Sequence, residues 1–212
     1  MKLQLALDFL DRDTAIKIAK ETVDYVDWIE AGTTITWVEG FQFIRDLRKL
    51  FPNKKILADL KIITGETYIA KYAFEAGADI VQVQACATDT VIRSAISIAR
   101  ECNKEIIVDV LGYLGDKVKR CIEVDKLGAD YIGVLANGFK DDPNYVLLVK
   151  KIVNAVKKPV AVGGGLNLDY LDQMFKVVKP EIIIIGGAII RSPNPREAAK
   201  ALKEKLLEES KL

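Results

Sequence analysis

The chain has 212 residues, of which 50% are hydrophobic and 29% are charged, and these proportions are typical of a globular protein with a sizeable core. Lys and Arg number 31 against 30 Asp and Glu, so the near-neutral charge argues against a nucleic acid or an anionic membrane surface as a partner. The sequence contains no histidine, which excludes Ser-His-Asp and Cys-His catalytic pairs, histidine-ligated zinc and imidazole acid–base chemistry.

Short apolar runs rich in β-branched residues alternate with longer amphipathic stretches along the chain. Strands are predicted at 3–7, 27–31, 56–60, 79–83, 105–109, 130–134, 159–162 and 181–185. A helix is predicted after each strand, at 14–24, 38–50, 66–76, 90–101, 117–127, 144–156, 168–178 and 195–208. This alternation predicts a single (β/α)8 TIM barrel over residues 1–212, with about 26 residues in each unit.

Three further features bear on fold and location. A doubly wound open sheet is the alternative fold, but its phosphate-binding glycines normally follow the first strand, whereas the glycine-rich segments here lie near the other end. The three cysteines form no Cys-x-x-Cys pair and the first residues lack a signal-peptide pattern, so we expect a cytoplasmic protein. The most apolar run, residues 181–187, is far shorter than the roughly 20 residues of a membrane span.

Acidic residues stand at the ends of four otherwise apolar strands. Asp8, Glu30, Asp59 and Asp109 are expected at the carboxyl-terminal face, where barrels of this type build their active sites. A carboxylate there needs a hydrogen bond, an ion pair or a metal, because burial of an unpaired charge is costly. Lys61 follows Asp59 by two residues, so both side chains are expected on one face of the strand as a pair. The alternative is that these acids cap helices or form structural ion pairs.

Two glycine-rich segments follow the last two predicted strands. Residues 161–165 read AVGGG and residues 185–188 read IGGA. Gly164, Gly165 and Gly187 are expected to bring backbone N–H groups close to a phosphate, which barrels often bind at these two loops. Arg191 is expected to contact the same phosphate, with simple solvation as the alternative. The implied ligand is a phosphorylated small molecule.

A phosphate opposite a carboxylate cluster creates electrostatic repulsion that Lys61 offsets only in part. A divalent cation bridging carboxylate and substrate oxygens would balance this charge, and an all-oxygen shell favours Mg²⁺. Glu30 and Asp59, from neighbouring strands, are the expected ligands. The charge balance also suggests an enediolate intermediate, stabilised by the metal and by Lys61.

At these residues the chain resembles the orotidine monophosphate decarboxylase superfamily, and within it the 3-hexulose-6-phosphate synthases and the 3-keto-L-gulonate-6-phosphate decarboxylases. The matching segments are residues 5–8 (LALD), 29–33 (IEAGT), 57–61 (LADLK), 75–79 (EAGAD) and 163–167 (GGGLN). The resemblance implies a homodimeric barrel in which Glu30 and Asp59 bind Mg²⁺ and the enediolate oxygens. Asp109 is more similar to the synthases, because the keto-gulonate enzymes tend to have Glu at its position.

The resemblance implies a lyase that joins formaldehyde to a phosphorylated ketose, ribulose 5-phosphate in the synthases. Asp59, Lys61 and Asp109 are the expected catalytic residues, and Asp8 and Thr64 are expected to bind substrate. Thr64 occupies the place of the second Asp of the family motif Asp-x-Lys-x-x-Asp, near the family's dimer interface.

Leu135 stands in the segment where the synthases have a histidine. A threonine hydroxyl can hold a substrate but has no useful pKa, and leucine does neither, so the identity of the proton carrier is open. A sugar-phosphate decarboxylase and a non-catalytic sugar-phosphate-binding protein are the alternatives.

Overall fold

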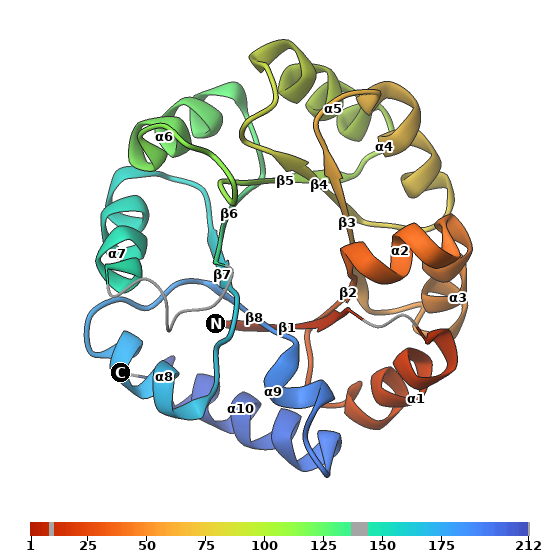
Figure 1. The fold of residues 1–212 in the computed structure, drawn as a ribbon, viewed down its shortest axis with the longest axis vertical. Helices are drawn as coiled ribbons and strands as arrows, with labels where there is room; N and C mark the ends of the chain where they lie inside the picture. Colours follow the sequence, from red (N-terminus) through yellow and green to blue (C-terminus); the bar gives the residue numbers. More distant parts are fainter. Residues whose placement is uncertain (9–10, 137–143, 212) are drawn as a thin grey trace.

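The computed structural model describes residues 1–8, 11–136 and 144–211, and its strands form a closed parallel barrel. Each strand pairs with the next one in the sequence, and the last pairs with the first, as Figure 1 shows in a view along the barrel. The strands are β1 Lys2–Leu7, β2 Trp28–Ala31, β3 Lys55–Ile62, β4 Ile80–Gln84, β5 Glu105–Asp109, β6 Tyr131–Leu135, β7 Val160–Gly163 and β8 Ile182–Ile185. The predicted TIM barrel is confirmed, and each predicted strand is present within two residues of its expected bounds.

The helices form a ring around the strands (Figure 1). They are α1 Arg12–Thr22, α2 Thr33–Glu39, α3 Phe41–Leu50, α4 Glu66–Glu75, α5 Asp89–Glu101, α6 Lys117–Leu127, α7 Tyr145–Ala155, α8 Leu168–Phe175, α9 Gly187–Ile190 and α10 Pro195–Glu209. Within the described ranges, no helix has both the length and the apolar character needed to cross a bilayer.

Two helices differ from the sequence prediction. The single helix expected at 38–50 is wrong, because α2 already begins at Thr33 and Gly40 separates it from α3. Gly40 has φ +62°, a left-handed conformation that interrupts regular helical geometry and that glycine adopts without steric cost. The four-residue helix α9 lies immediately after β8 and was not predicted. Both additional helices begin at residues that border the candidate site.

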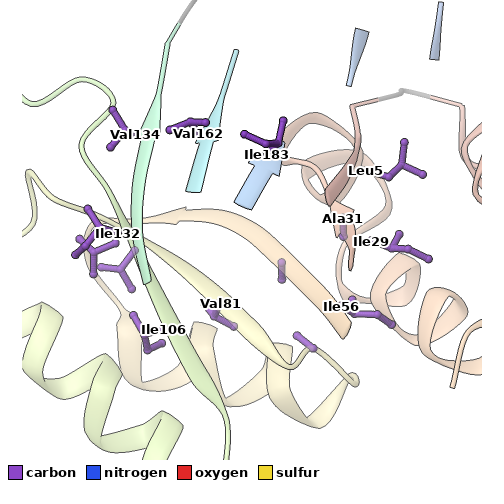
Figure 2. Packing of buried hydrophobic residues seen from close by; sticks show 14 of the residues in the cluster. Leu5, Ile29, Ala31, Ile56, Val81, Ile106, Ile132, Val134, Val162 and Ile183 are labelled. Atoms are coloured by element: carbon purple, nitrogen blue, oxygen red, sulfur yellow. The ribbon is translucent and has the colours of Figure 1, made fainter. Parts of the chain in front are cut away.

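The side chains of the strands alternate between two apolar layers. Those that face outward pack against the helices, and Figure 2 shows part of this layer, including Leu5, Ile29 and Val81. Those that face inward form a second cluster, Ala6, Trp28, Leu57, Ile80, Ile107, Ala161, Ile182 and Ile184. Because strand side chains alternate with a period of two, the strand-end acids Glu30, Asp59 and Asp109 share the inward face with this second cluster.

Large side chains fill the amino-terminal end of the barrel interior. Trp28 and Tyr131 contact each other edge to face, with ring centroids 5.1 Å apart. The Lys55 ammonium lies 5.2 Å from the centroid of the Trp28 ring and pairs with Glu105. This packing fills the amino-terminal end of the interior with large side chains, whereas the inward residues at the opposite end include the polar Glu30, Asp59 and Asp109.

Candidate active site

A cavity of about 240 Å³ lies at the carboxyl ends of the strands. Seven predicted site residues border it, namely Asp8, Glu30, Asp59, Lys61, Gly164, Gly165 and Gly187. The remaining lining residues are Ala6, Thr33, Leu111, Leu135, Ala136, Ile184 and Gly186. The structure therefore brings the strand-end acids and the two glycine segments to a single cavity, although they are separated by up to 179 positions in the sequence.

Lys61 and Asp59 form an ion pair at the centre of this cavity. The Lys61 Nζ lies 2.8 Å from the Asp59 Oδ2, consistent with the two-residue spacing. The strand is irregular here, because its register with β4 shifts between Ala58 and Ile62. Lys61 itself has φ +50°, a left-handed conformation that is uncommon for a residue other than glycine. Such strained backbone occurs preferentially at functional sites, and here it belongs to the residue that presents the ammonium.

Thr33 is a site residue that the sequence reasoning did not identify. Its Oγ1 donates a hydrogen bond to the Asp59 Oδ2 at 2.7 Å, so this one carboxylate oxygen accepts from both Thr33 and Lys61. Thr33 is the first residue of α2, and its segment IEAGT was recognised only as part of a family motif. The other oxygen, Asp59 Oδ1, is buried and has no hydrogen-bond partner among the described residues.

Two further carboxylates lie beside Asp59. Glu30 is 4% exposed, and burial together with the negative charges of Asp59 and Asp8 raises its pKa well above the usual value. Burial and Asp59 also raise the pKa of Asp8, while Lys61 and the backbone N–H groups of Thr34 and Thr33 act in the opposite direction. Three carboxylates, Asp8, Glu30 and Asp59, thus line the cavity together with the ammonium of Lys61.

The donor set fits a hard divalent cation. Asp59 Oδ1 is a buried acceptor without a partner among the described residues, and Glu30 is an adjacent carboxylate in a strongly negative environment. Within the described ranges, no group of three or more Asp, Glu, Cys or His side chains is arranged as a complete metal site. Mg²⁺ characteristically binds proteins through one or two carboxylates and completes its shell with water and substrate oxygens. Glu30 and Asp59 could therefore supply part of a Mg²⁺ coordination shell, and water and substrate oxygens would supply the rest.

Asp109 lies behind the cavity and does not border it. Its side chain is fully buried, and its Oδ2 lies 3.9 Å from the Lys61 Nζ. The backbone N–H groups of Leu111 and Leu135 donate to its Oδ1 at 3.0 and 3.2 Å, and Gln82 donates to its Oδ2 at 3.3 Å. Burial raises the pKa of Asp109 to about 6, although Lys61 and these N–H groups lower it. Asp109 is therefore connected to the cavity through its approach to Lys61 and not through the cavity wall.

Glycines form the opposite wall of the cavity. Gly164 and Gly165 have φ +109° and +85°, and a Cβ on Gly164 would lie 1.9 Å from the carbonyl oxygen of Ala136. A Cβ on Gly187 would lie 2.2 Å from Nη2 of Arg191, so this guanidinium rests against the glycine backbone. Only glycine fits at Gly164, because the close atom there belongs to the backbone, whereas the Arg191 side chain beside Gly187 can move. The backbone that these glycines leave accessible suits the binding of an anion.

Three predicted site residues are absent from the described lining. Thr64 is exposed beyond the end of β3, Arg191 is exposed at the edge next to Gly187, and Asp109 is buried. Leu135, by contrast, borders the cavity, so an apolar side chain occupies a place near the reacting groups.

Comparison with known proteins agrees with this architecture. The family model described as "Orotidine 5'-phosphate decarboxylase / HUMPS family" matches residues 1–202. The chain belongs to this family. The 3-hexulose-6-phosphate synthase of Bacillus subtilis is 35% identical over 213 residues, which cover 98% of this chain and all of that protein. The synthase of Staphylococcus aureus strain USA300 is 36% identical, covering 94% and 96% of the two chains.

Solved structures of related proteins superpose closely on this chain. The 3-hexulose-6-phosphate synthase of Salmonella typhimurium superposes with a TM-score of 0.91 at 30% identity, covering 99% of this chain and 100% of that one. The KGPDC of Streptococcus mutans, solved as a ligand complex, gives a TM-score of 0.90 at 28% identity, covering 98% and 97%. The predicted membership of the superfamily and the likeness to its synthases are confirmed.

The close approach at Gly164 can be tested against a matched glycine. Gly128 also has a left-handed backbone, with φ +99°, but a Cβ there would meet nothing within 4 Å. Both Gly164→Ala and Gly128→Ala therefore introduce similar backbone strain, and only the first adds a collision. In urea unfolding we expect Gly164→Ala to lose about 1–3 kcal/mol more stability than Gly128→Ala. Equal losses would contradict the described packing against Ala136.

The raised pKa of Asp109 predicts a specific pH dependence of stability. Its pKa is about 6 in the folded protein against 3.8 for an ordinary Asp, so the folded state binds this proton more tightly. Stability contributed by the protonated group is therefore lost as pH rises from about 4 to about 6, by roughly 2–3 kcal/mol. Asp109→Asn should lack this loss, and the exposed control Asp13→Asn should retain it, in urea unfolding between pH 4 and 7. Parallel curves for the wild type and Asp109→Asn would contradict the shift.

Proposed function

We propose that the protein is a Mg²⁺-dependent lyase that joins formaldehyde to a phosphorylated ketose, ribulose 5-phosphate, through an enediolate. The observation that carries this proposal is the Lys61–Asp59 pair, which faces a glycine-lined wall across one cavity. The relatives named 3-hexulose-6-phosphate synthase, at 35% and 36% identity over nearly the whole chain, support the choice of reaction.

The closed strand order sets the direction of the substrate. β3 and β4 lie across the barrel from β7 and β8 (Figure 1). A phosphate held by Gly164, Gly165 and Gly187, with Arg191 at the edge, therefore directs the other end of an extended sugar towards Lys61. The substrate-binding roles that we propose for these four residues rest on this arrangement.

Glu30 and Asp59 would hold the Mg²⁺ ion. When bound, the ion supplies Lewis-acid polarisation of substrate oxygens and neutralises part of the charge of the cluster. One oxygen of Asp59 accepts hydrogen bonds from Thr33 and Lys61, whereas the other has no partner among the described residues and could bind the ion.

Lys61 stabilises the charge that develops during the reaction. Loss of a proton from the carbon beside the ketone leaves negative charge on the carbonyl oxygen, and the electron pair then forms the bond to formaldehyde. Burial lowers the pKa of Lys61, but Asp59 and Asp109 outweigh this effect and raise it, so the side chain remains a cation that donates to this oxygen. Asp8, whose pKa is raised, is the described lining carboxylate outside the metal pair. We assign it as the base that takes this proton from carbon and returns it to the formaldehyde oxygen, which becomes the new hydroxyl.

A non-catalytic sugar-phosphate-binding protein is the second candidate. Leu135 borders the cavity and Thr64 lies outside its lining, so neither supplies acid–base chemistry in the described part of the chain. Such a protein would still bind the sugar phosphate at the glycine-lined wall but would not turn it over.

A decarboxylase reaction through the same enediolate is supported by the similarity to the KGPDC structure.

The reaction can be tested by measuring formaldehyde consumption with ribulose 5-phosphate, with Mg²⁺ and after its removal by a chelator. We expect Mg²⁺-dependent consumption by the wild type and a loss of about 10²–10³-fold in kcat for Lys61→Met, because stabilisation of the developing oxyanion is removed. Lys20→Met, on the exposed face of α1, is the control. Calorimetric binding of ribulose 5-phosphate without consumption would favour the binding protein, and no binding would exclude this ligand.

We also propose that the protein functions as a homodimer. Five exposed large apolar side chains lie on α2, after β3 and on α4, namely Trp37, Val38, Ile63, Tyr68 and Tyr72. Tyr72 lies within 6.3 Å, between ring centroids, of both Phe41 and Tyr68, so part of this surface is continuous. An exposed apolar surface of this kind favours a protein partner, and Thr64 lies in the same region of the sequence. A second copy of the chain is the partner that the family resemblance implies.

Substitution of this surface should change the oligomeric state. Trp37 is 75% exposed, so Trp37→Lys removes apolar contact area without creating a buried charge in the isolated chain. In analytical ultracentrifugation we expect the wild type to sediment as a dimer and Trp37→Lys to shift towards the monomer by at least about tenfold in Kd. Leu114→Lys, at another fully exposed position, should remain dimeric. A monomeric wild type would overturn the dimer.

A further inference from the structure

Gln4 is a polar residue in the middle of the apolar strand β1. It is 1% exposed, and its neighbours Leu3 and Leu5 face the helices. The alternation of the strand places Gln4 on the inward face together with Ala6, which belongs to the interior cluster. A buried amide inside a barrel is costly unless its hydrogen bonds are made, so its contacts indicate why it is retained.

The amide of Gln4 contacts one of the proposed metal ligands. Its Nε2 donates to the Glu30 Oε2 at 2.6 Å, between adjacent strands. The register pairs Gln4 with Trp28 and Ala6 with Glu30, so Gln4 lies one inward position below Glu30 along the barrel. Within the described ranges this is the hydrogen bond that the Glu30 carboxylate accepts. The other end of the amide, Gln4 Oε1, is buried without a described partner.

This contact opposes the forces that act on Glu30. Asp59 and Asp8 repel the Glu30 carboxylate, and a glutamate side chain has several rotatable bonds by which it can move away. A short hydrogen bond to a buried amide on the adjacent strand fixes the carboxylate at the cavity, which Glu30 borders. The hydrogen-bond partners of metal ligands orient those ligands in this way, and their loss commonly reduces metal affinity 10–100-fold.

We infer that Gln4 is a positioning residue for the divalent cation site, holding Glu30 in the orientation that binds Mg²⁺ beside Asp59. The inference rests on the proposed function, since it takes Glu30 and Asp59 as the metal pair. The hydrogen bond to Glu30 is the described interaction that offsets burial of this amide, since its Oε1 has no partner among the described residues. Gln4 touches neither substrate nor metal in this assignment.

The test replaces Gln4 by a side chain of similar length without an amide. Gln4→Met removes the hydrogen bond to Glu30 and also removes the unsatisfied carbonyl. Calorimetric titration with Mg²⁺ alone should show an affinity about 10–100-fold below that of the wild type. The thermal midpoint of the metal-free protein should not fall, whereas a purely structural role for Gln4 requires that it does. Gln82→Met is the matched control, because this buried amide contacts Asp109 on the other side of the barrel.

The outcomes separate the inference from the proposed function. A selective loss of Mg²⁺ affinity in Gln4→Met, with Gln82→Met within about twofold of the wild type, supports the positioning role. Equal affinity of the wild type and Gln4→Met overturns that role and leaves the metal site intact. A wild type that does not bind Mg²⁺ overturns the proposed metal pair and the positioning role with it. A lowered thermal midpoint with unchanged affinity assigns Gln4 to the fold alone.

Discussion

The site depends on one electrostatic constraint, which is that several inward carboxylates share the single ammonium of Lys61 among the described lining residues. Asp59 contacts this ammonium directly at 2.8 Å, and Asp109 approaches it from behind at 3.9 Å. Asp8 and Glu30 remain without a cationic contact of their own in the described part of the chain. Burial and the neighbouring carboxylates raise the pKa values of both, so a positive charge that enters the cavity, whether a metal ion or a proton, would be stabilised there.

The two ends of the barrel interior differ in packing and in backbone geometry. At the amino-terminal end the space is filled by Trp28, Tyr131 and Lys55. The two rings pack edge to face, and the Lys55 ammonium makes cation–π contacts with both. At the carboxyl-terminal end, Lys61 has a left-handed backbone and Gly164 approaches a carbonyl group too closely for any side chain. Strained geometry persists only where surrounding structure enforces it, and the closed barrel with its two apolar layers supplies that enforcement. Both of these features border the cavity at the carboxyl ends of the strands.

The sequence was sufficient for the fold because each strand is a short β-branched run followed by an amphipathic helix. It also placed Asp59 and Lys61 on one face, since a period of two is a local property. It failed at α2, where Gly40 divides a pattern that looks continuous. It also did not predict that Asp109 is buried behind the cavity, where its partners come from residues 82, 111 and 135. Thr33 and Gln4 were missed because each contacts a residue 26 positions away on a different element, and the spacing within one strand or helix does not predict such contacts.

Helix α2 connects the cavity to the exposed apolar surface. At its first turn, the backbone N–H groups of Thr33 and Thr34 bind Asp8, and the Thr33 hydroxyl binds Asp59. Gly32 precedes it because a Cβ there would lie 2.4 Å from Asp8. At its other end the same helix presents Trp37 and Val38 to solvent. A partner packed on those side chains would therefore restrict the helix whose first turn contacts two carboxylates, because only seven residues, Thr33–Glu39, form α2.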